Sequence, residues 1–255
     1  MIKEYLKHLL KPAKNNNKVK KTFKVSKLIA DAGICSRRKA ELLIKEGRVK
    51  LNNKILVSIP ERATVEDLIK VDNKKINLEK KIRLWKYNKP TGKLTTNYDP
   101  EGRRTIFDEL PKNLPRVITV GRLDFNSEGL LLLTNSGKLA RYLELPKSSF
   151  VREYKVKIKG NIDIKKLENL GKGITIKGIK YKSIKINILK RNKDTTLIKM
   201  KLIEGKNREI RKIISFFGCS VNKLERISYG PIQLKKLKKN EVEEININKY
   251  FKKIP

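Results

Sequence analysis

The segment VITVGRLDFNSEGLLLL, which spans residues 117–133, carries the pattern that decides the fold. Its two apolar runs, Val117–Val120 and Leu130–Leu133, have the length and composition of short buried strands. A polar connection, residues 121–129, separates them. Because loops held by rigid strands are frequent places for functional side chains, we predict a site in this connection. Asp124 is its candidate carboxylate, although by spacing alone a loop aspartate is more often a residue that caps a turn.

The surrounding sequence predicts a domain in which strands dominate. Strand patterns occur at residues 84–87, 154–158, 174–188 and 197–202. Residues 206–218 form the clearest helix, since an apolar face with Ile210 and Ile213 lies opposite a face with Arg208 and Arg211. No regular alternation of strand and helix is present. We therefore predict an α+β domain over residues 82–250 with a mixed, largely antiparallel sheet.

A smaller unit is predicted before this domain, at residues 25–72. Its pattern is two short helices followed by strands, with Asn52-Asn53 as a hairpin turn. Ser36 is a good N-cap for the second helix, whose first turn contains only cations, Arg37, Arg38 and Lys39. Residues 1–24 are predicted to be a flexible basic leader, and residues 73–81 a linker.

The net charge indicates a polyanionic partner. Sixty-three Lys and Arg against 26 Asp and Glu give a formal charge of +37. Such an excess attracts polyanions, of which nucleic acid is the commonest. Lys, Ile and Asn are abundant throughout, so the codon usage of an AT-rich genome is an alternative source of part of this charge.

Histidine and cysteine content argues against several kinds of chemistry. The single histidine, His8, lies in the basic leader, so a Ser-His-Asp triad, a Cys-His pair and the common zinc sites are not expected. Cys35 and Cys219 are too few for a disulfide framework and are predicted to be small buried hydrophobes. Chemistry in this chain is therefore expected to depend on carboxylates, Tyr, Lys, Ser or a bound metal.

The sequence also predicts where the protein works. No run approaches the roughly 20 apolar residues that span a bilayer, and the first 25 residues lack the features of a signal or transit peptide. We therefore expect a cytoplasmic protein without membrane contact, and a monomer.

Several motifs follow one another in a recognisable order. They are Gly121–Asp124 with Glu128–Asn135, Arg152-Glu153-Tyr154, and Glu204–Arg211, together with the segments 88–92 and 102–105. In this order and spacing they resemble the RsuA/RluB-type family of bacterial ribosomal RNA pseudouridine synthases. Residues 25–72 resemble the small RNA-binding domain named after ribosomal protein S-four, which this family often carries at its N-terminus.

The resemblance implies an enzyme that converts uridine in RNA into its C-glycoside isomer. The base is detached, turned and rejoined through C5, and no cofactor, metal or histidine is needed. Asp124 matches the essential carboxylate, which acts either as covalent nucleophile or as stabiliser of a cationic sugar. Arg211 matches the arginine that keeps this aspartate ionised, and a two-pronged contact is expected. Tyr154 matches the tyrosine that stacks on the target base and is a candidate to remove the C5 proton.

Other cations are candidates for RNA contacts. Lys89 and Arg122 are expected to line the pocket or contact RNA, or else to support the loop. Further candidate RNA contacts are Arg37, Arg38, Lys39, Arg48 and Arg208, for which solvation of a charged face is the alternative.

The expected partner is ribosomal RNA or a pre-ribosomal particle. Asn207-Arg208-Glu209 resembles the branch of the family that acts on the large subunit. The alternatives are a non-catalytic rRNA-binding or ribosome-assembly protein, a ribosomal protein, and a basic DNA-binding protein.

Overall fold

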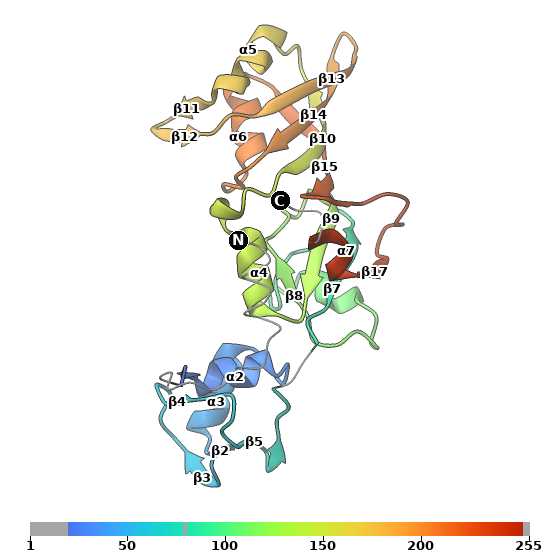
Figure 1. Cartoon of the computed structure of the whole chain (residues 1–255). Helices are drawn as coiled ribbons and strands as arrows, with labels where there is room; N and C mark the ends of the chain where they lie inside the picture. The colour runs from blue at the N-terminus through green and yellow to red at the C-terminus, as the bar shows by residue number, and fades with distance from the viewer. Residues whose placement is uncertain (1–19, 79–80, 252–255) are drawn as a thin grey trace.

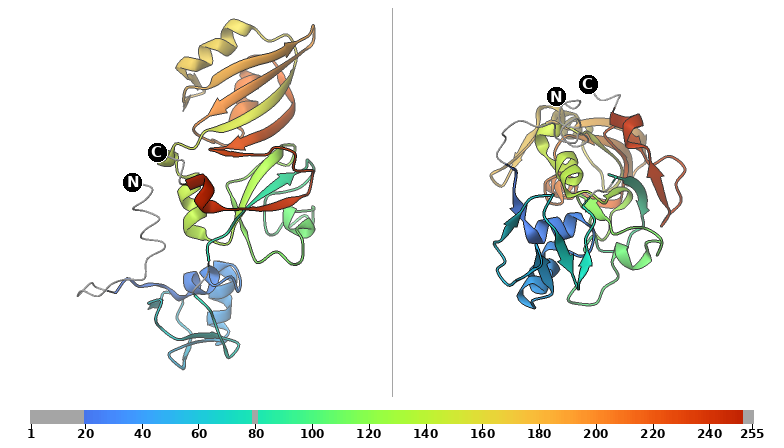
Figure 2. Two further views of the ribbon diagram at one scale, coloured as in Figure 1. Left: turned by 45° about the vertical axis from the view of Figure 1, so that its right-hand side comes forward. Right: turned by 60° about the horizontal axis from the view of Figure 1, so that its bottom comes forward.

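The computed structural model describes residues 20–78 and 81–251 (Figure 1). Most of the predicted leader therefore lies outside the described residues, including His8. Within the described part, the chain forms a small N-terminal unit and a larger part built on one extended sheet (Figures 1 and 2). The α+β fold with a mixed sheet is confirmed.

The small unit packs two helices against short strands. Its elements are β1 (Phe23–Lys24), α2 (Val25–Asp31), α3 (Arg37–Lys45), β2 (Val49–Leu51), β3 (Lys54–Leu56), β4 (Arg62–Ala63), β5 (Ile69–Val71) and β6 (Lys74–Lys75). Ser36 caps α3 as expected, because its side chain accepts a hydrogen bond from the Lys39 N–H at 3.2 Å. Asn52 and Asn53 both have positive φ and turn the chain between β2 and β3.

This unit is longer at both ends than the sequence suggested. Phe23–Lys24, placed in the predicted leader, pairs with β4. Lys74–Lys75, placed in the predicted linker, pairs with β5, and Ile76 is buried in the core of the small unit. The charges of these segments masked their strand pairing, which depends on backbone hydrogen bonds and on one buried side chain rather than on an apolar run.

The larger part contains a nine-stranded sheet. Its main order is β13-β14-β10-β15-β9-β7-β17, and β8 and β16 pair with β9 and β15. These strands are β7 (Leu84–Lys89), β8 (Ile118–Val120), β9 (Glu128–Thr134), β10 (Arg152–Lys159), β13 (Lys185–Arg191), β14 (Thr195–Leu202), β15 (Ser220–Tyr229), β16 (Ile232–Gln233) and β17 (Val242–Ile245). A separate hairpin joins β11 (Ile174–Ile176) to β12 (Ile179–Tyr181).

Helices cover the sheet and complete the core. The helices are η1 (Ile106–Glu109), α4 (Gly137–Glu144), η2 (Pro146–Ser148), α5 (Ile164–Asn169), η3 (Leu170–Lys172), α6 (Glu209–Phe216) and α7 (Ile247–Phe251). Ile210, Ile213 and Ile214 of α6 are buried in a core shared with β10, β14 and α5, as the apolar face predicted. The sequence had not predicted α4, α5 or β15 as separate elements.

One strand pair brings distant segments together. All neighbouring pairs of the sheet are antiparallel except β9 and β15, which are parallel with Glu128 opposite Glu225 and Gly129 opposite Arg226. Gly129 has φ +96°, and an added Cβ would lie 2.3 Å from the Arg226 carbonyl oxygen, so only glycine fits here. Because the two strands run the same way, the segments that precede them, residues 121–127 and α6, lie at the same end of the pair.

Candidate active site

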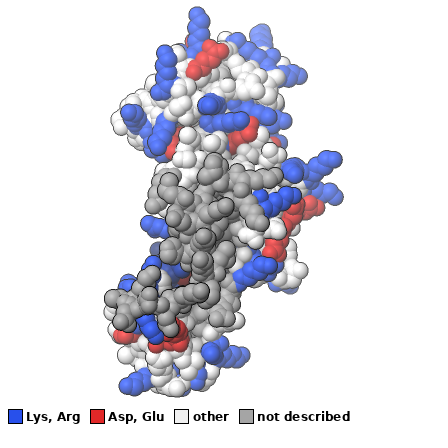
Figure 3. Space-filling view, viewed as in Figure 1, with Lys and Arg blue, Asp and Glu red and all other residues white. Residues whose placement is uncertain are grey.

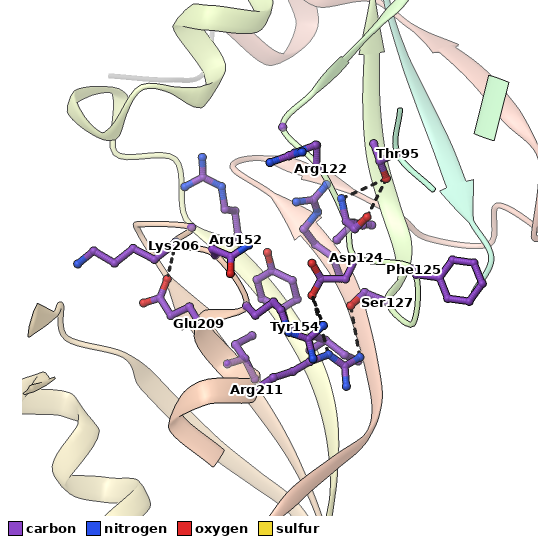
Figure 4. A pocket seen from close by; sticks show the side chains of 18 of the residues that line it. Thr95, Arg122, Asp124, Phe125, Ser127, Arg152, Tyr154, Lys206, Glu209 and Arg211 are labelled. Carbon is purple, nitrogen blue, oxygen red and sulfur yellow. Dashed lines mark hydrogen bonds and ion pairs between the residues drawn. The ribbon is translucent and has the colours of Figure 1, made fainter. Parts of the chain in front are cut away.

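A cavity of about 900 Å³ opens where these two segments meet. Its walls come from the connection between β8 and β9, from the segment before α6, and from strands β10 and β15. Asp124, Tyr154 and Arg211 lie close together at its centre (Figure 4). We call residues 121–127 the Asp124 loop. The structure thus brings the three principal residues of the sequence prediction into one pocket.

Two arginines flank the Asp124 carboxylate. Asp124 Oδ2 lies 3.7 Å from Arg208 Nη1 and 3.9 Å from Arg211 Nε. The Arg211 side chain is 14% exposed, whereas that of Arg208 is 50% exposed, so the two cations stand in different surroundings. The expected two-pronged contact from Arg211 is wrong in detail, because a single nitrogen of that arginine faces one carboxylate oxygen.

The other nitrogens of Arg211 hold the backbone of the site. Arg211 donates hydrogen bonds from Nη2 to the Asn126 carbonyl at 2.9 Å and from Nη1 to the Val221 carbonyl at 3.2 Å. Burial, together with the positive charge of Arg208, lowers the pKa of Arg211, and Asp124 opposes that shift. Arg211 therefore clamps the Asp124 loop to the start of β15 while its Nε faces the carboxylate.

Arg208 adopts an uncommon backbone conformation. Its φ is 51° and ψ is 33°, in the left-handed region, at the N-cap of α6. Such a conformation costs a non-glycine residue free energy and is often found at functional sites. The sequence predicted Arg208 as an RNA contact, and the structure places its guanidinium beside Asp124 with half of its surface exposed.

Lys89 lies beneath the Asp124 loop and not on its surface. It is fully buried, and its ammonium donates to the carbonyls of Pro90 at 2.9 Å, Asp124 at 3.2 Å and Ser127 at 2.9 Å. Burial lowers its pKa to about 8, and the nearby charges of Asp124 and Glu128 oppose that shift. Of the roles predicted for Lys89, the structure shows support of the loop and not RNA contact, because its three N–H groups already donate to these carbonyls.

A further carboxylate orients the start of the loop. Glu144, at the end of α4, accepts a hydrogen bond from the Gly121 N–H at 2.7 Å through Oε1. Thr95 holds the middle, because its hydroxyl donates to the Leu123 carbonyl at 2.8 Å. Arg122 is exposed and lines the pocket between these two anchors. Neither Glu144 nor Thr95 is predictable from the sequence, since both act through backbone groups that no motif specifies.

Tyr154 stands on β10 next to a group of buried arginines. It is opposite Arg226 of β15, and the guanidinium groups of Arg152 and Arg226 lie 4.8 and 5.3 Å from the ring centre of Tyr229. Arg152 donates to the Tyr229 hydroxyl at 2.8 Å, and Arg226 Nε donates to the Leu130 carbonyl at 2.6 Å. Arg152, Arg226 and Tyr229 line the same pocket as Tyr154, so its wall carries positive charge beyond the two arginines beside Asp124.

Glu209 is a buried acid at the edge of the pocket. It is 4% exposed, its Oε2 accepts from the Lys206 N–H at 2.9 Å, and Oε1 has no hydrogen-bond partner among the described residues. Burial raises the pKa of Glu209 to about 7, the Lys206 N–H opposes the shift, and the negative charge of Glu204 adds to it. This residue holds the turn that leads into Arg208.

The predicted RNA contacts of the small unit divide into two groups. Arg37, Arg38 and Lys39 are exposed in the first turn of α3, where they are accessible to phosphates. Arg48 is not free in this way, because it donates to both Asp72 oxygens at 2.7 and 2.8 Å and to Glu46 at 3.1 Å. The prediction of Arg48 as a phosphate contact is therefore not supported.

The surface charge and, among the described residues, the absence of metal-binding clusters and membrane-spanning helices describe the surroundings in which the pocket lies. Lys and Arg are spread over the visible face of the molecule and outnumber the acidic residues on it (Figure 3). Within residues 20–78 and 81–251, no three His, Cys, Asp or Glu side chains are grouped so that they could hold a metal ion. Over the same residues, no helix is both long and apolar enough to cross a membrane.

Comparison with known proteins gives consistent matches over most of the chain. A family model described as RNA pseudouridylate synthase matches residues 83–216, and one described as S4 domain matches residues 24–58. An uncharacterized RNA pseudouridine synthase of Rickettsia typhi is 45% identical and covers 91% of this chain and 95% of its own. The ribosomal large subunit pseudouridine synthase B of Bacillus subtilis is 36% identical and covers 87% of this chain and 91% of its own.

The fold has a solved counterpart. A crystal structure described as a pseudouridylate synthase superposes with a TM-score of 0.64 over 89% of this chain and 98% of its own, at 24% sequence identity. At this level of identity the comparison shows a shared fold.

Proposed function

Because this chain belongs to the RNA pseudouridylate synthase family and isomerises uridine in RNA, we propose that its target is a uridine of large-subunit ribosomal RNA and that Asp124 is its catalytic carboxylate. Support for the large subunit comes from the name of the Bacillus subtilis relative and from Asn207-Arg208-Glu209 in the motif that precedes α6. The partner is then ribosomal RNA or a pre-ribosomal particle.

One observation carries the assignment of Asp124. Its carboxylate lies between two guanidinium groups, at 3.7 and 3.9 Å, in a cavity that also contains Tyr154. A negative charge held in this way can stabilise a positive charge that develops on a sugar, or can attack its anomeric carbon. The loop that presents it is anchored by Lys89, Thr95, Glu144 and Arg211, so little reorganisation is needed during the reaction.

The proposed reaction proceeds in the pocket with the nucleotide turned out of its stack. The C1′–N1 bond breaks, and its electron pair leaves with N1 of the uracil, while Asp124 bonds to C1′ or stabilises its positive charge. The base turns and C5 bonds to C1′; where Asp124 has bonded to C1′, that bond breaks and its electron pair returns to the carboxylate. C5 then loses its proton and N1 gains one. In this proposal Tyr154, which lines the pocket with Asp124, stacks on the base, and the exposed cations Arg122 and Arg208 contact the adjoining phosphates.

The small unit is proposed to anchor the RNA. Arg37, Arg38 and Lys39 are exposed together at the start of α3, a helix whose N-terminus adds further positive potential. Contacts of this kind read phosphates and position the RNA without specifying sequence. The S4 domain match over the same residues supports this role.

The test replaces one oxygen of the carboxylate. Asp124→Asn keeps the shape and removes the charge, so pseudouridine formation should fall to background while RNA affinity and thermal stability stay close to those of the unmodified protein. Mapping pseudouridines in total RNA from cells with the wild-type or the variant protein would identify the target. Asp194→Asn, an exposed loop aspartate, is the matched control. Turnover of Asp124→Asn near the original rate would contradict the assignment and favour another carboxylate.

A further inference from the structure

Two aromatic side chains at the rim of the active-site pocket are exposed. Tyr98 is 78% exposed and Phe125 is 41% exposed, and both line the cavity that contains Asp124. Burial of an aromatic ring usually stabilises a folded protein, and these two exposed rings do not contribute in that way. Exposed aromatic rings beside a nucleic-acid site are suited to stack on bases.

Tyr98 is presented by a rigid loop. The next residue, Asp99, accepts hydrogen bonds from Arg103 N at 3.0 Å, Nε at 3.0 Å and Nη2 at 2.8 Å. On the other side, the Thr96 hydroxyl donates to the Tyr98 carbonyl at 2.9 Å. Gly102 closes the loop with φ +67°. The exposure of Tyr98 is therefore a property of a braced loop that holds the ring in solvent.

The segment before Tyr98 is hydrogen-bonded to the segment that carries Phe125. The Thr95 hydroxyl donates to the Leu123 carbonyl at 2.8 Å, and the Gly92 N–H donates to the Phe125 carbonyl at 2.9 Å. The two backbone segments that carry these rings are thus joined to each other beside Asp124, which directly precedes Phe125. We call Tyr98 and Phe125 the aromatic rim.

The direction of Phe125 separates it from the target base. Its ring points away from Tyr154 and from the Asp124 carboxylate (Figure 4). A base held against Tyr154 would not contact Phe125. A base of a neighbouring nucleotide, outside the pocket, can reach it. The exposed cation Arg122, which lines the same cavity, is available to contact the backbone between the two nucleotides.

We propose that the aromatic rim stacks on unpaired nucleobases that flank the target uridine. This inference rests on the proposed function and narrows its substrate class to uridines in loops or bulges. Turning one nucleotide out of a stack removes a neighbour from the adjoining bases, and an aromatic ring can replace that neighbour. Because every base has a π-face, the rim contributes affinity with little sequence preference.

The test measures binding of a single-stranded probe. A fluorescent oligouridine of about 12 nucleotides, within the range of a single-stranded binding site, is titrated with the full chain at fixed salt and followed by anisotropy. Tyr98→Ala and Phe125→Ala should each raise Kd by about 5- to 100-fold, which corresponds to the loss of one base stack. Tyr98→Phe and Phe125→Tyr keep a ring and should stay close to wild type.

The controls distinguish stacking from a general defect. Phe216→Ala removes a ring that is 57% exposed on α6 and does not line the pocket, so it should leave Kd unchanged. A blunt RNA duplex of the same length exposes base faces only at its two end pairs, and closing both ends with tetraloops covers these too. The affinity for the closed duplex should not change in the rim variants. Unchanged oligouridine affinity in both alanine variants, or an equal loss for the duplex, would overturn the proposal. Failure of Asp124→Asn to lose activity would instead refute the catalytic assignment and leave these binding results intact.

Discussion

Replacing Glu209 by glutamine should stabilise the protein in a way that depends on pH. The carboxyl is 4% exposed and its pKa is raised from 4.5 to about 7, mainly by burial. Between these two values the folded chain holds a proton that the unfolded chain has released, so the free energy of unfolding falls as pH rises from 4.5 to 7 and is then flat. With about 1.4 kcal/mol for each pKa unit, the cost of burying the ionised group above pH 7 is about 3 kcal/mol.

Glu209→Gln removes this cost and keeps an oxygen that can accept from the Lys206 N–H. We expect the variant to be more stable than wild type by about 3 kcal/mol at pH 8 and by less than about 1 kcal/mol at pH 5. For a chain of this size that corresponds to a rise in Tm of about 5 to 10 °C at pH 8.

The assay is urea or thermal unfolding at both pH values. Glu168→Gln, an exposed glutamate on α5, serves as control and should leave the pH dependence unchanged. A Glu209→Gln variant that is equally stabilised at both pH values, or is less stable at pH 8, would show that burial of this carboxyl carries no such cost.

Two further predictions concern the groups that hold the Asp124 loop. Lys89→Met leaves three carbonyls, one of them fully buried, without their donor. It should lower the free energy of unfolding near neutral pH by about 2 kcal/mol and reduce kcat more than it raises KM. Burial lowers the Lys89 pKa from 10.5 to about 8, so between these pH values the unfolded chain holds a proton that the folded chain has released. The free energy of unfolding of the wild type should therefore rise from pH 8 to pH 10.5, and that of Lys89→Met should lack this rise. Unfolding curves that show the same pH dependence for both proteins would contradict the burial of a titrating Lys89. Arg211→Lys should keep part of the activity and Arg211→Met much less, because lysine retains a charge near Asp124 but cannot hold both the Asn126 and Val221 carbonyls. Single-turnover rates would check this order. Equal rates in the two variants would show that the positive charge at position 211 does not contribute to the reaction.

Sequence patterns predicted the elements whose identity depends on local periodicity. The strands around the Asp124 loop and the helix with Ile210 and Ile213 follow from apolar runs and from helical spacing, and the structure contains them. The motifs also led to Asp124, Tyr154 and Arg211, which share one pocket.

The remaining features depend on tertiary contacts that no local pattern specifies. Nothing in the sequence around Glu209, which stands between Arg208 and Ile210, indicates burial, but α6 packs so that its carboxyl is buried. Lys89 looks like an exposed lysine at a strand end, and only the fold brings the carbonyls of Asp124 and Ser127 to its ammonium. The ion pair of Arg48 was also not predictable from local sequence, since its partner Asp72 lies on a different turn of the small unit.

The parallel pairing of β9 with β15 also affects the order in which the protein folds. Glu128 and Glu225, which it places opposite each other, are separated by nearly a hundred residues of chain. Contacts between such remote positions form late, because the entropy of closing the intervening loop must be overcome first. A chain emerging from the ribosome has therefore completed the Asp124 loop long before β15 is available to pair with it. The pocket that holds Asp124 therefore cannot be assembled before residues 220–229 have been made, so nascent chains that lack them should be inactive toward RNA.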